Sequence, residues 1–176
     1  MKVKAALETG RIRHLEICTV ELEEPRDNEV LVKIVACGIC HTDAMMQGEG
    51  LLLGHEGCGI VVRTGAGVEN VSQGDHVILS YTHCGHCRSC RENRPYECDY
   101  IYDPFFLGYR LDGTSPVSYH GRTIPTLIRQ GSFAEYAVVD ETAVVKINPD
   151  LNLCCLAPLG CGMMTGAGAV VNCLKS

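Results

Sequence analysis

The chain has 176 residues, a length typical of one domain or of one domain with part of another. An apolar fraction of 46% argues against disorder, and a formal net charge of −6 argues against nucleic acid or a membrane surface as partner. No apolar run approaches the roughly 18 residues of a spanning helix, and the start lacks a signal peptide. We therefore expect a cytoplasmic protein with reduced thiols.

Short strand patterns run through most of the chain. Residues 29–38, 59–65, 74–81 and 132–147 have alternating or β-branched apolar side chains, with Gly, Asn, Asp and Pro at the turns between them. Strands this short and closely spaced predict an antiparallel barrel or sandwich. After Pro149 the chain is rich in Gly and Ala and favours helix.

Four of the twelve cysteines lie together in one polar loop. Cys84, Cys87, Cys90 and Cys98 have the spacing C-x2-C-x2-C-x7-C. In a reducing compartment, clustered thiols indicate metal binding rather than disulfides. Zinc and an iron–sulfur cluster are the two candidates, and the spacing departs from the bacterial ferredoxin pattern after the third cysteine, which favours zinc. We expect a zinc-binding lobe over about residues 83–100, called the cysteine lobe below.

A second set of candidate ligands is dispersed along the chain. The motif CGICHTD contains Cys40, GHEG contains His55, and GCG contains Cys161. A catalytic zinc has three protein ligands and one open position. A single cysteine is more often a small packing group, and a single histidine a hydrogen-bonded surface group. Spacing alone does not show whether these three side chains meet.

The order of the motifs adds information that no single motif carries. The chain contains CGICHTD, LGHEGCGIV, GDHVI, the cysteine lobe and LGCGMMTGAGAV, in that order. It resembles the zinc-dependent medium-chain alcohol dehydrogenases through essentially its whole length. The resemblance implies a mostly β fold with short helices, a GroES-like partly open β-barrel carrying the lobe. It divides the chain into a catalytic domain over residues 1–155 and a helical connection over 156–176.

The same resemblance implies two zinc ions per chain. The four lobe cysteines would bind a structural zinc. The catalytic zinc would be bound by Cys40, His55 and Cys161, with Glu56 beside it as an alternate ligand. Asp43 would orient His55, as carboxylates commonly do for metal-bound histidines.

The implied reaction is oxidation of a primary alcohol to an aldehyde with NAD(P). Thr42 would accept the substrate proton, and His41 would contact the cofactor pyrophosphate. Met45 stands where liver-type enzymes have a histidine. Relatives that act on benzyl-type alcohols also lack that histidine, so an aryl or allylic alcohol is the expected substrate. The segment TGAGAVV does not fit the dinucleotide fingerprint G-x-G-x-x-G. We therefore expect the catalytic part of a longer enzyme, inactive alone, whose complete form is a homodimer or homotetramer.

Other features have simpler interpretations. The segment between Cys40 and His55 is shorter than is usual in the family, which would alter the substrate mouth. Residues 100–109 predict an ordinary hydrophobic patch. Small packing groups are expected at six further cysteines: Cys18, Cys37, Cys58, Cys154, Cys155 and Cys173.

Two other classes of function stay open at this point. One is a zinc-stabilised binding module without catalysis, which would leave the dispersed ligands unexplained. The other is an iron–sulfur electron carrier.

Overall fold

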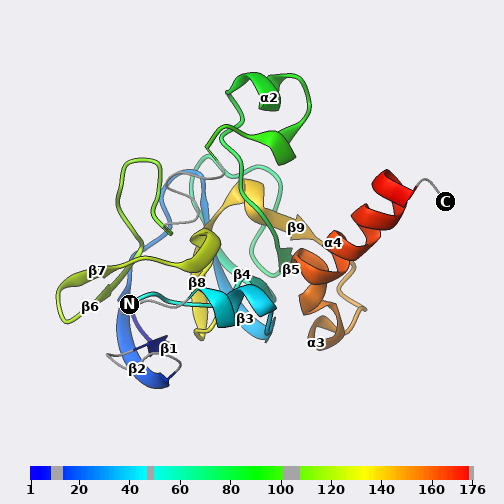
Figure 1. Ribbon diagram of the computed structural model, residues 1–176. Coiled ribbons are helices and arrows are strands. Elements are labelled where there is room, and N and C mark those ends of the chain that lie inside the picture. The colour runs from blue at the N-terminus through cyan, green and yellow to red at the C-terminus, as the bar shows by residue number, and fades with distance from the viewer. Residues whose placement is uncertain (9–13, 47–49, 101–107, 175–176) are drawn as a thin grey trace.

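Two antiparallel sheets form the framework of the computed structural model, which describes residues 1–8, 14–46, 50–100 and 108–174 (Figure 1). The first sheet has the order β1-β2-β6-β7, made of Lys2–Glu8, Leu15–Leu22, Val117–Tyr119 and Arg122–Ile124. The second has the order β8-β3-β4-β5-β9, made of Tyr136–Asp140, Glu29–Gly38, Glu56–Thr64, His76–Leu79 and Val144–Lys146.

The four predicted strand regions are confirmed, with one division, and four further strands are present among the described residues. The single pattern over 132–147 becomes β8 and β9, separated by the short 3-10 helix η3 (Glu141–Ala143). The side chain of Asp140 starts that turn by accepting a 3.0 Å hydrogen bond from the Thr142 N–H. Strands β1 and β2 were not predicted, and neither was the β6–β7 hairpin. Its turn residues His120 and Gly121 both have positive φ, at 50° and 74°, as a tight two-residue hairpin requires.

The two sheets are joined along one side, and the described strands do not close into a barrel. Leu7 of β1 pairs with Leu52 in an isolated bridge. Glu135 lies between the sheets, since its N–H donates to the Lys4 carbonyl (2.9 Å) and its carbonyl accepts from the Ile34 N–H (3.0 Å). This arrangement confirms the predicted partly open barrel.

The first residues of β3 are buried on both faces of the second sheet, which explains the continuous apolar run there. Val30 and Val32 pack into one core cluster with residues of β4, β5 and β8. Leu31, between them, points to the opposite face and packs into the other main cluster with β1 and β2. A strand between two cores has no solvent-facing side, so its side chains need not alternate in polarity.

The predicted helical tail is confirmed, although it is broken into short pieces. They are α3 (Leu153–Leu156), η4 (Ala157–Gly160), α4 (Gly162–Gly168) and η5 (Ala169–Leu174). Leu153 and Ala157 pack on Cys58 and Ile78 of the second sheet. Beyond Cys161 the tail leads away from the sheets (Figure 1), and α4 and η5 contain no buried residue.

The expectation for the tail cysteines was wrong. Cys154, Cys155 and Cys173 are exposed, because the tail contacts the sheet through other positions. Cys58 is buried as expected, and Cys18 and Cys37 are partly buried. Burial raises the pKa of Cys37 to about 12, so its thiol stays protonated.

No single helix among the described residues is long and apolar enough to cross a membrane. Leu153–Gly160 and Gly162–Leu174 reach the required length and composition only as a pair, across a bend of 56°.

A buried arginine ties an internal loop to the second sheet. Arg110 donates from Nε and Nη2 to the two carboxylate oxygens of Glu29, at 2.6 and 2.8 Å, and from Nη1 to Glu23 at 2.7 Å. Burial lowers the pKa of Arg110, but these carboxylates outweigh it and the pKa is raised overall. These hydrogen bonds offset the cost of burying the two charges. Loss of Arg110 would leave the buried Glu29 carboxylate without its main partner.

We predict that Arg110→Ala lowers the free energy of unfolding by about 3–5 kcal/mol, the range for breaking a buried ion pair. Urea unfolding measures this difference. Arg63→Ala is the matched control, because its partner Glu24 and Arg63 itself are both exposed; its loss should cost at most about 1 kcal/mol. Equal effects of the two substitutions would contradict the role given to Arg110.

Candidate metal centres

Two groups of metal-binding side chains come together among the described residues. In each group the donor atoms all lie within 4.8 Å of one another. One group is the four cysteines of the cysteine lobe. The other, called the Cys–His–Glu cluster below, gathers the dispersed residues Cys40, His55, Glu56 and Cys161. The structure thus shows that these side chains meet, which their spacing in the sequence could not show.

Strand pairing places most of the Cys–His–Glu cluster. Strands β3 and β4 run antiparallel with Gly38 opposite Glu56, so the end of β3 lies beside the start of β4. Cys40 follows β3 directly as the N-cap of α1 (His41–Met45). Cys161 reaches the same place from the tail, where it caps the end of η4 beside β5.

Asp43 connects the separate parts of the cluster. One carboxylate oxygen accepts the Cys40 N–H at 2.9 Å. The other accepts the Gly54 N–H and contacts His55 Nδ1, both at 3.0 Å. Burial raises the pKa of Asp43, but these hydrogen bonds outweigh it and the pKa is lowered. The side chain is therefore an ionised acceptor.

His55 presents an unsatisfied nitrogen to the cluster. Because an ionised Asp43 can only accept, Nδ1 carries a proton and Nε2 faces the cysteines. Nε2 is buried and has no hydrogen-bond partner among the described residues. Such an atom costs about 1–3 kcal/mol when it stays unpaired. A zinc ion would satisfy it, so the donor set fits zinc.

One other buried side-chain atom, His76 Nδ1, also lacks a partner in the described part of the chain. It belongs to neither group of metal donors. The unpaired nitrogen of His55 is informative because two thiols and a carboxylate surround it. Burial lowers the pKa of His55, but the Asp43 and Cys40 side chains outweigh it and raise the pKa. The same negative surroundings favour a divalent cation.

The two thiols of the cluster have different surroundings. Burial raises the pKa of Cys40, but hydrogen bonding by Thr42 and the charge of the nearby His55 outweigh it and the pKa is lowered. The Thr42 hydroxyl lies 3.7 Å from the Cys40 sulfur. Burial raises the pKa of Cys161, and the Tyr81 hydroxyl lies 3.1 Å from its sulfur. Tyr81 was not among the site residues predicted from the sequence. Its only local signal is that it continues the alternation of β5 past the buried Leu79.

Two predicted site residues remain: Glu56 belongs to the cluster, and His41 does not. Glu56 accepts a 2.9 Å hydrogen bond from the Gly162 N–H, which ties it to the start of α4. His41 is exposed and outside the cluster. It lies with Met45 and Phe133 along a cleft of about 730 Å³ that Asp43 also lines. We call it the α1 cleft.

Sulfur spacing in the cysteine lobe fits a single tetrahedral ion. Cys84 and Cys90 have their sulfurs 3.9 Å apart, and Cys87 and Cys98 have theirs 4.0 Å apart. Four thiolates bonded to zinc at about 2.3 Å in a tetrahedron would be about 3.8 Å apart. A disulfide needs a separation of about 2 Å. A cluster of several irons and sulfides needs more room between its thiolates than 4.8 Å leaves, so an iron–sulfur cluster of this kind is disfavoured.

The lobe has little else to hold it together. It stands apart from the sheets in Figure 1, and its helices α2 (Arg88–Arg91) and η1 (Pro95–Glu97) contain no buried residue. Backbone N–H groups point at the sulfurs, with the Cys87 N–H 3.3 Å from the Cys84 sulfur. Backbone hydrogen bonds from Cys90 and Asp99 lower the pKa of Cys87 to about 6. Such a loop can be fixed by its metal.

Two expectations fall partly outside the described residues. The short segment between the first two candidate ligands includes residues 47–49, and the hydrophobic patch at 100–109 includes residues 101–107.

Residues 26–149 match the alcohol dehydrogenase GroES-like domain, so the chain belongs to that family. S-(hydroxymethyl)glutathione dehydrogenase of Escherichia coli is 40% identical over 183 residues, which cover 99% of this chain and 50% of that protein. The chain spans about half the length of the curated relatives it matches.

Solved structures agree with this assignment. An alcohol dehydrogenase zinc-binding domain protein from Burkholderia ambifaria has a TM-score of 0.92 at 37% identity, over 99% of this chain and 50% of that one. Benzyl alcohol dehydrogenase from Acinetobacter calcoaceticus has a TM-score of 0.89 at 35% identity, over 99% and 49%. The resemblance stated from the motifs and the predicted GroES-like fold are both confirmed.

We predict that Asp43→Asn weakens metal binding at the Cys–His–Glu cluster about 10- to 100-fold, because the amide no longer holds His55 by a charged hydrogen bond. Zinc release to a competing chelator measures this affinity, and the cysteine lobe should keep its zinc. Asp75→Asn is the control, since Asp75 pairs with the exposed Lys146. Unchanged zinc release in Asp43→Asn would contradict the orienting role of Asp43.

Proposed function

We propose that the chain is the catalytic part of a zinc-dependent alcohol dehydrogenase, which oxidises a primary alcohol to an aldehyde with NAD(P). The observation that carries this proposal is the meeting of Cys40 and Cys161 beside His55 Nε2, which has no hydrogen-bond partner among the described residues. The division at residue 155, two zinc ions per chain, an oligomeric complete enzyme and a cytoplasmic location belong to the same proposal.

Zinc and a nicotinamide cofactor would supply the chemistry that side chains cannot. When bound, zinc would lower the pKa of an alcohol hydroxyl, and a nicotinamide would accept the hydride. The chain's own residues position these groups and handle the proton. Asp43 holds His55 toward the ligand cluster through its 3.0 Å contact with Nδ1.

In this proposal Thr42 would move the proton. Its hydroxyl is 3.7 Å from the Cys40 sulfur and can both accept a proton and donate one. Met45 cannot continue a relay, because a thioether carries no exchangeable proton. The proton would therefore leave past the exposed His41, through the cofactor ribose or through water. His41 would also meet the cofactor pyrophosphate.

Two substrate classes have support. The methionine at position 45 and the likeness to benzyl alcohol dehydrogenase favour an aryl or allylic alcohol. The curated relatives favour S-(hydroxymethyl)glutathione, which also carries a primary hydroxyl. A zinc-stabilised binding module without catalysis is less well supported, because the Cys–His–Glu cluster and its oriented histidine would then have no role.

We predict that Thr42→Val lowers kcat about 10²- to 10⁴-fold, the usual contribution of a positioned proton-transfer group. Thr42→Ser keeps the hydroxyl and should retain most of the activity. Reduction of NAD⁺ or NADP⁺ by benzyl alcohol and by S-(hydroxymethyl)glutathione, followed by absorbance in the complete enzyme, measures this. Zinc content serves as the control for an intact site. Full activity in Thr42→Val would remove Thr42 from the mechanism, and inactivity of the zinc-loaded parent enzyme toward both alcohols would overturn the proposed function.

A further inference from the structure

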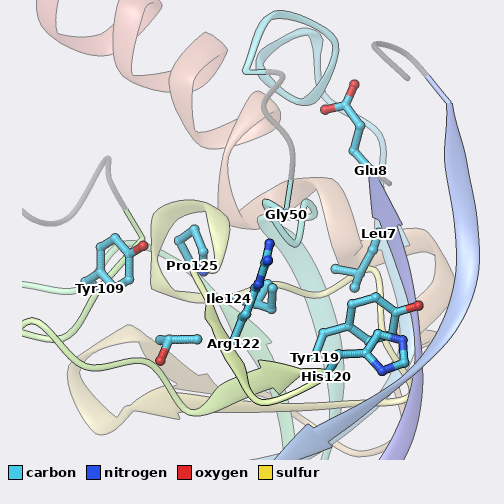
Figure 2. A pocket seen from close by; sticks show the side chains of 10 residues that line it. Leu7, Glu8, Gly50, Tyr109, Tyr119, His120, Arg122, Ile124 and Pro125 are labelled. Carbon is cyan, nitrogen blue, oxygen red and sulfur yellow. The ribbon is translucent and has the colours of Figure 1, made fainter. Parts of the chain in front are cut away.

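A second cleft, of about 840 Å³, opens beside the β6–β7 hairpin (Figure 2). Leu7, Ile124 and Pro125 supply apolar surface, and Tyr109 and Tyr119 supply aromatic surface. None of these residues belongs to the metal donor groups. We call it the Arg122 cleft, after the one arginine among its lining residues.

The Arg122 side chain is available to a ligand. Figure 2 shows its guanidinium extending toward Gly50, with Tyr109 on one side and Tyr119 and His120 on the other. Arg122 is exposed and makes no ion pair or side-chain hydrogen bond with another described residue. Most other described arginines have a carboxylate partner: Arg26, Arg63, Arg88, Arg94, Arg110 and Arg129.

The hairpin gives this cation a defined position. Tyr119 pairs with Arg122 across the strands, and the tight turn between them fixes His120. The rings of Tyr119 and His120 lie 4.1 Å apart between centroids. The Ser115 hydroxyl donates to the Ile124 carbonyl at 2.6 Å and braces the base of the hairpin. Groups on paired strands hold a ligand more firmly than groups on a free loop.

The charges around the cleft favour an anion. Glu8 is the one acidic residue among the described lining residues, but it is buried and already has a partner. His120 can add a hydrogen-bond donor to those of Arg122. A guanidinium binds a carboxylate through two parallel hydrogen bonds, which is stronger and more specific than a single neutral contact.

The Arg122 cleft lies close to the proposed reaction site. Glu8 lines both this cleft and the α1 cleft, so the two share a wall. Gly50 lines the Arg122 cleft, and His55 follows it by five residues. Five extended residues span at most about 18 Å, which limits the distance between their α-carbons. A substrate the size of a short peptide, met by the reach of an arginine, can cover even this upper limit, and benzyl alcohol has no carboxylate to bring to Arg122.

We propose that the Arg122 cleft binds a carboxylate at the far end of the alcohol substrate. The site then selects alcohols that carry an anionic tail of about peptide length over small neutral alcohols. This inference rests on the proposed function and refines its substrate class. S-(hydroxymethyl)glutathione has such a tail, with two carboxylates, and benzyl alcohol has none.

The test compares kcat/KM for these two alcohols in the complete enzyme. Arg122→Gln should lower kcat/KM for S-(hydroxymethyl)glutathione about 10- to 100-fold, as expected for loss of a charged hydrogen-bonding group. The loss should be mainly in KM, because the contact is remote from the reacting atoms. Benzyl alcohol should react at the same rate within about twofold. Arg122→Lys should recover only part of the loss, because lysine cannot bind both oxygens in the same plane.

Arg91→Gln is the matched control, since Arg91 is an exposed arginine of the cysteine lobe without an ion pair to a described residue. It should leave both alcohols unaffected. A loss in Arg122→Gln that is equal for both alcohols, or absent for the glutathione adduct, would overturn the proposal.

A binding measurement separates this proposal from the proposed function. Calorimetric titration with S-methylglutathione, which has no hydroxyl to oxidise, should show binding that weakens about 10- to 100-fold in Arg122→Gln and is unchanged in Arg91→Gln. If the analogue binds in this way while neither alcohol is oxidised, the cleft assignment holds and the proposed function fails. If alcohols are oxidised but the analogue binds equally to parent and Arg122→Gln, the cleft assignment fails alone.

Discussion

The carboxylate of Asp43 is the contact on which the candidate site depends. It caps the start of α1 through the Cys40 N–H, holds the Gly54 N–H and contacts His55 Nδ1. The buried Asp43 carboxylate thereby holds the segment that follows β3 against the segment that precedes β4. A second support lies behind His55, where the Ser132 N–H donates to the Gly54 carbonyl at 2.9 Å. These hydrogen bonds hold the ligand side chains in position, as precise coordination requires.

That second support includes unusual backbone. Ile128 and Arg129 both have positive φ, at 53° and 56°, which is rare for a residue other than glycine and especially for a β-branched one. Ile128 is buried beside Leu53 and Leu127, so packing holds the turn in this conformation. Strained turns of this kind often occur where a functional group must be placed accurately. Here the turn leads to Ser132, whose N–H binds the Gly54 carbonyl next to His55.

Local features were predictable from sequence, and long-range ones were not. The strand β3 follows from its apolar pattern, and the cysteine lobe follows from thiol spacing within one loop. The meeting of Cys161 with Cys40 depends on how the tail returns to the sheet, which no local pattern encodes, and only the family resemblance suggested it. The Arg110–Glu29 pair and the Arg122 cleft likewise join segments far apart in the sequence. Exposed Cys154 and Cys155 were misassigned because composition does not tell which side of a short helix faces the core.

The most direct test of the account is the metal content of the protein, measured by elemental analysis after purification without added metal or chelator. The account predicts two zinc ions per chain in the parent protein. Cys40→Ser and Cys84→Ser should each retain one, because each substitution damages a different group of ligands. A parent protein with one zinc that survives Cys40→Ser would contradict a metal site at the Cys–His–Glu cluster. Iron in place of zinc would contradict the assignment of the cysteine lobe.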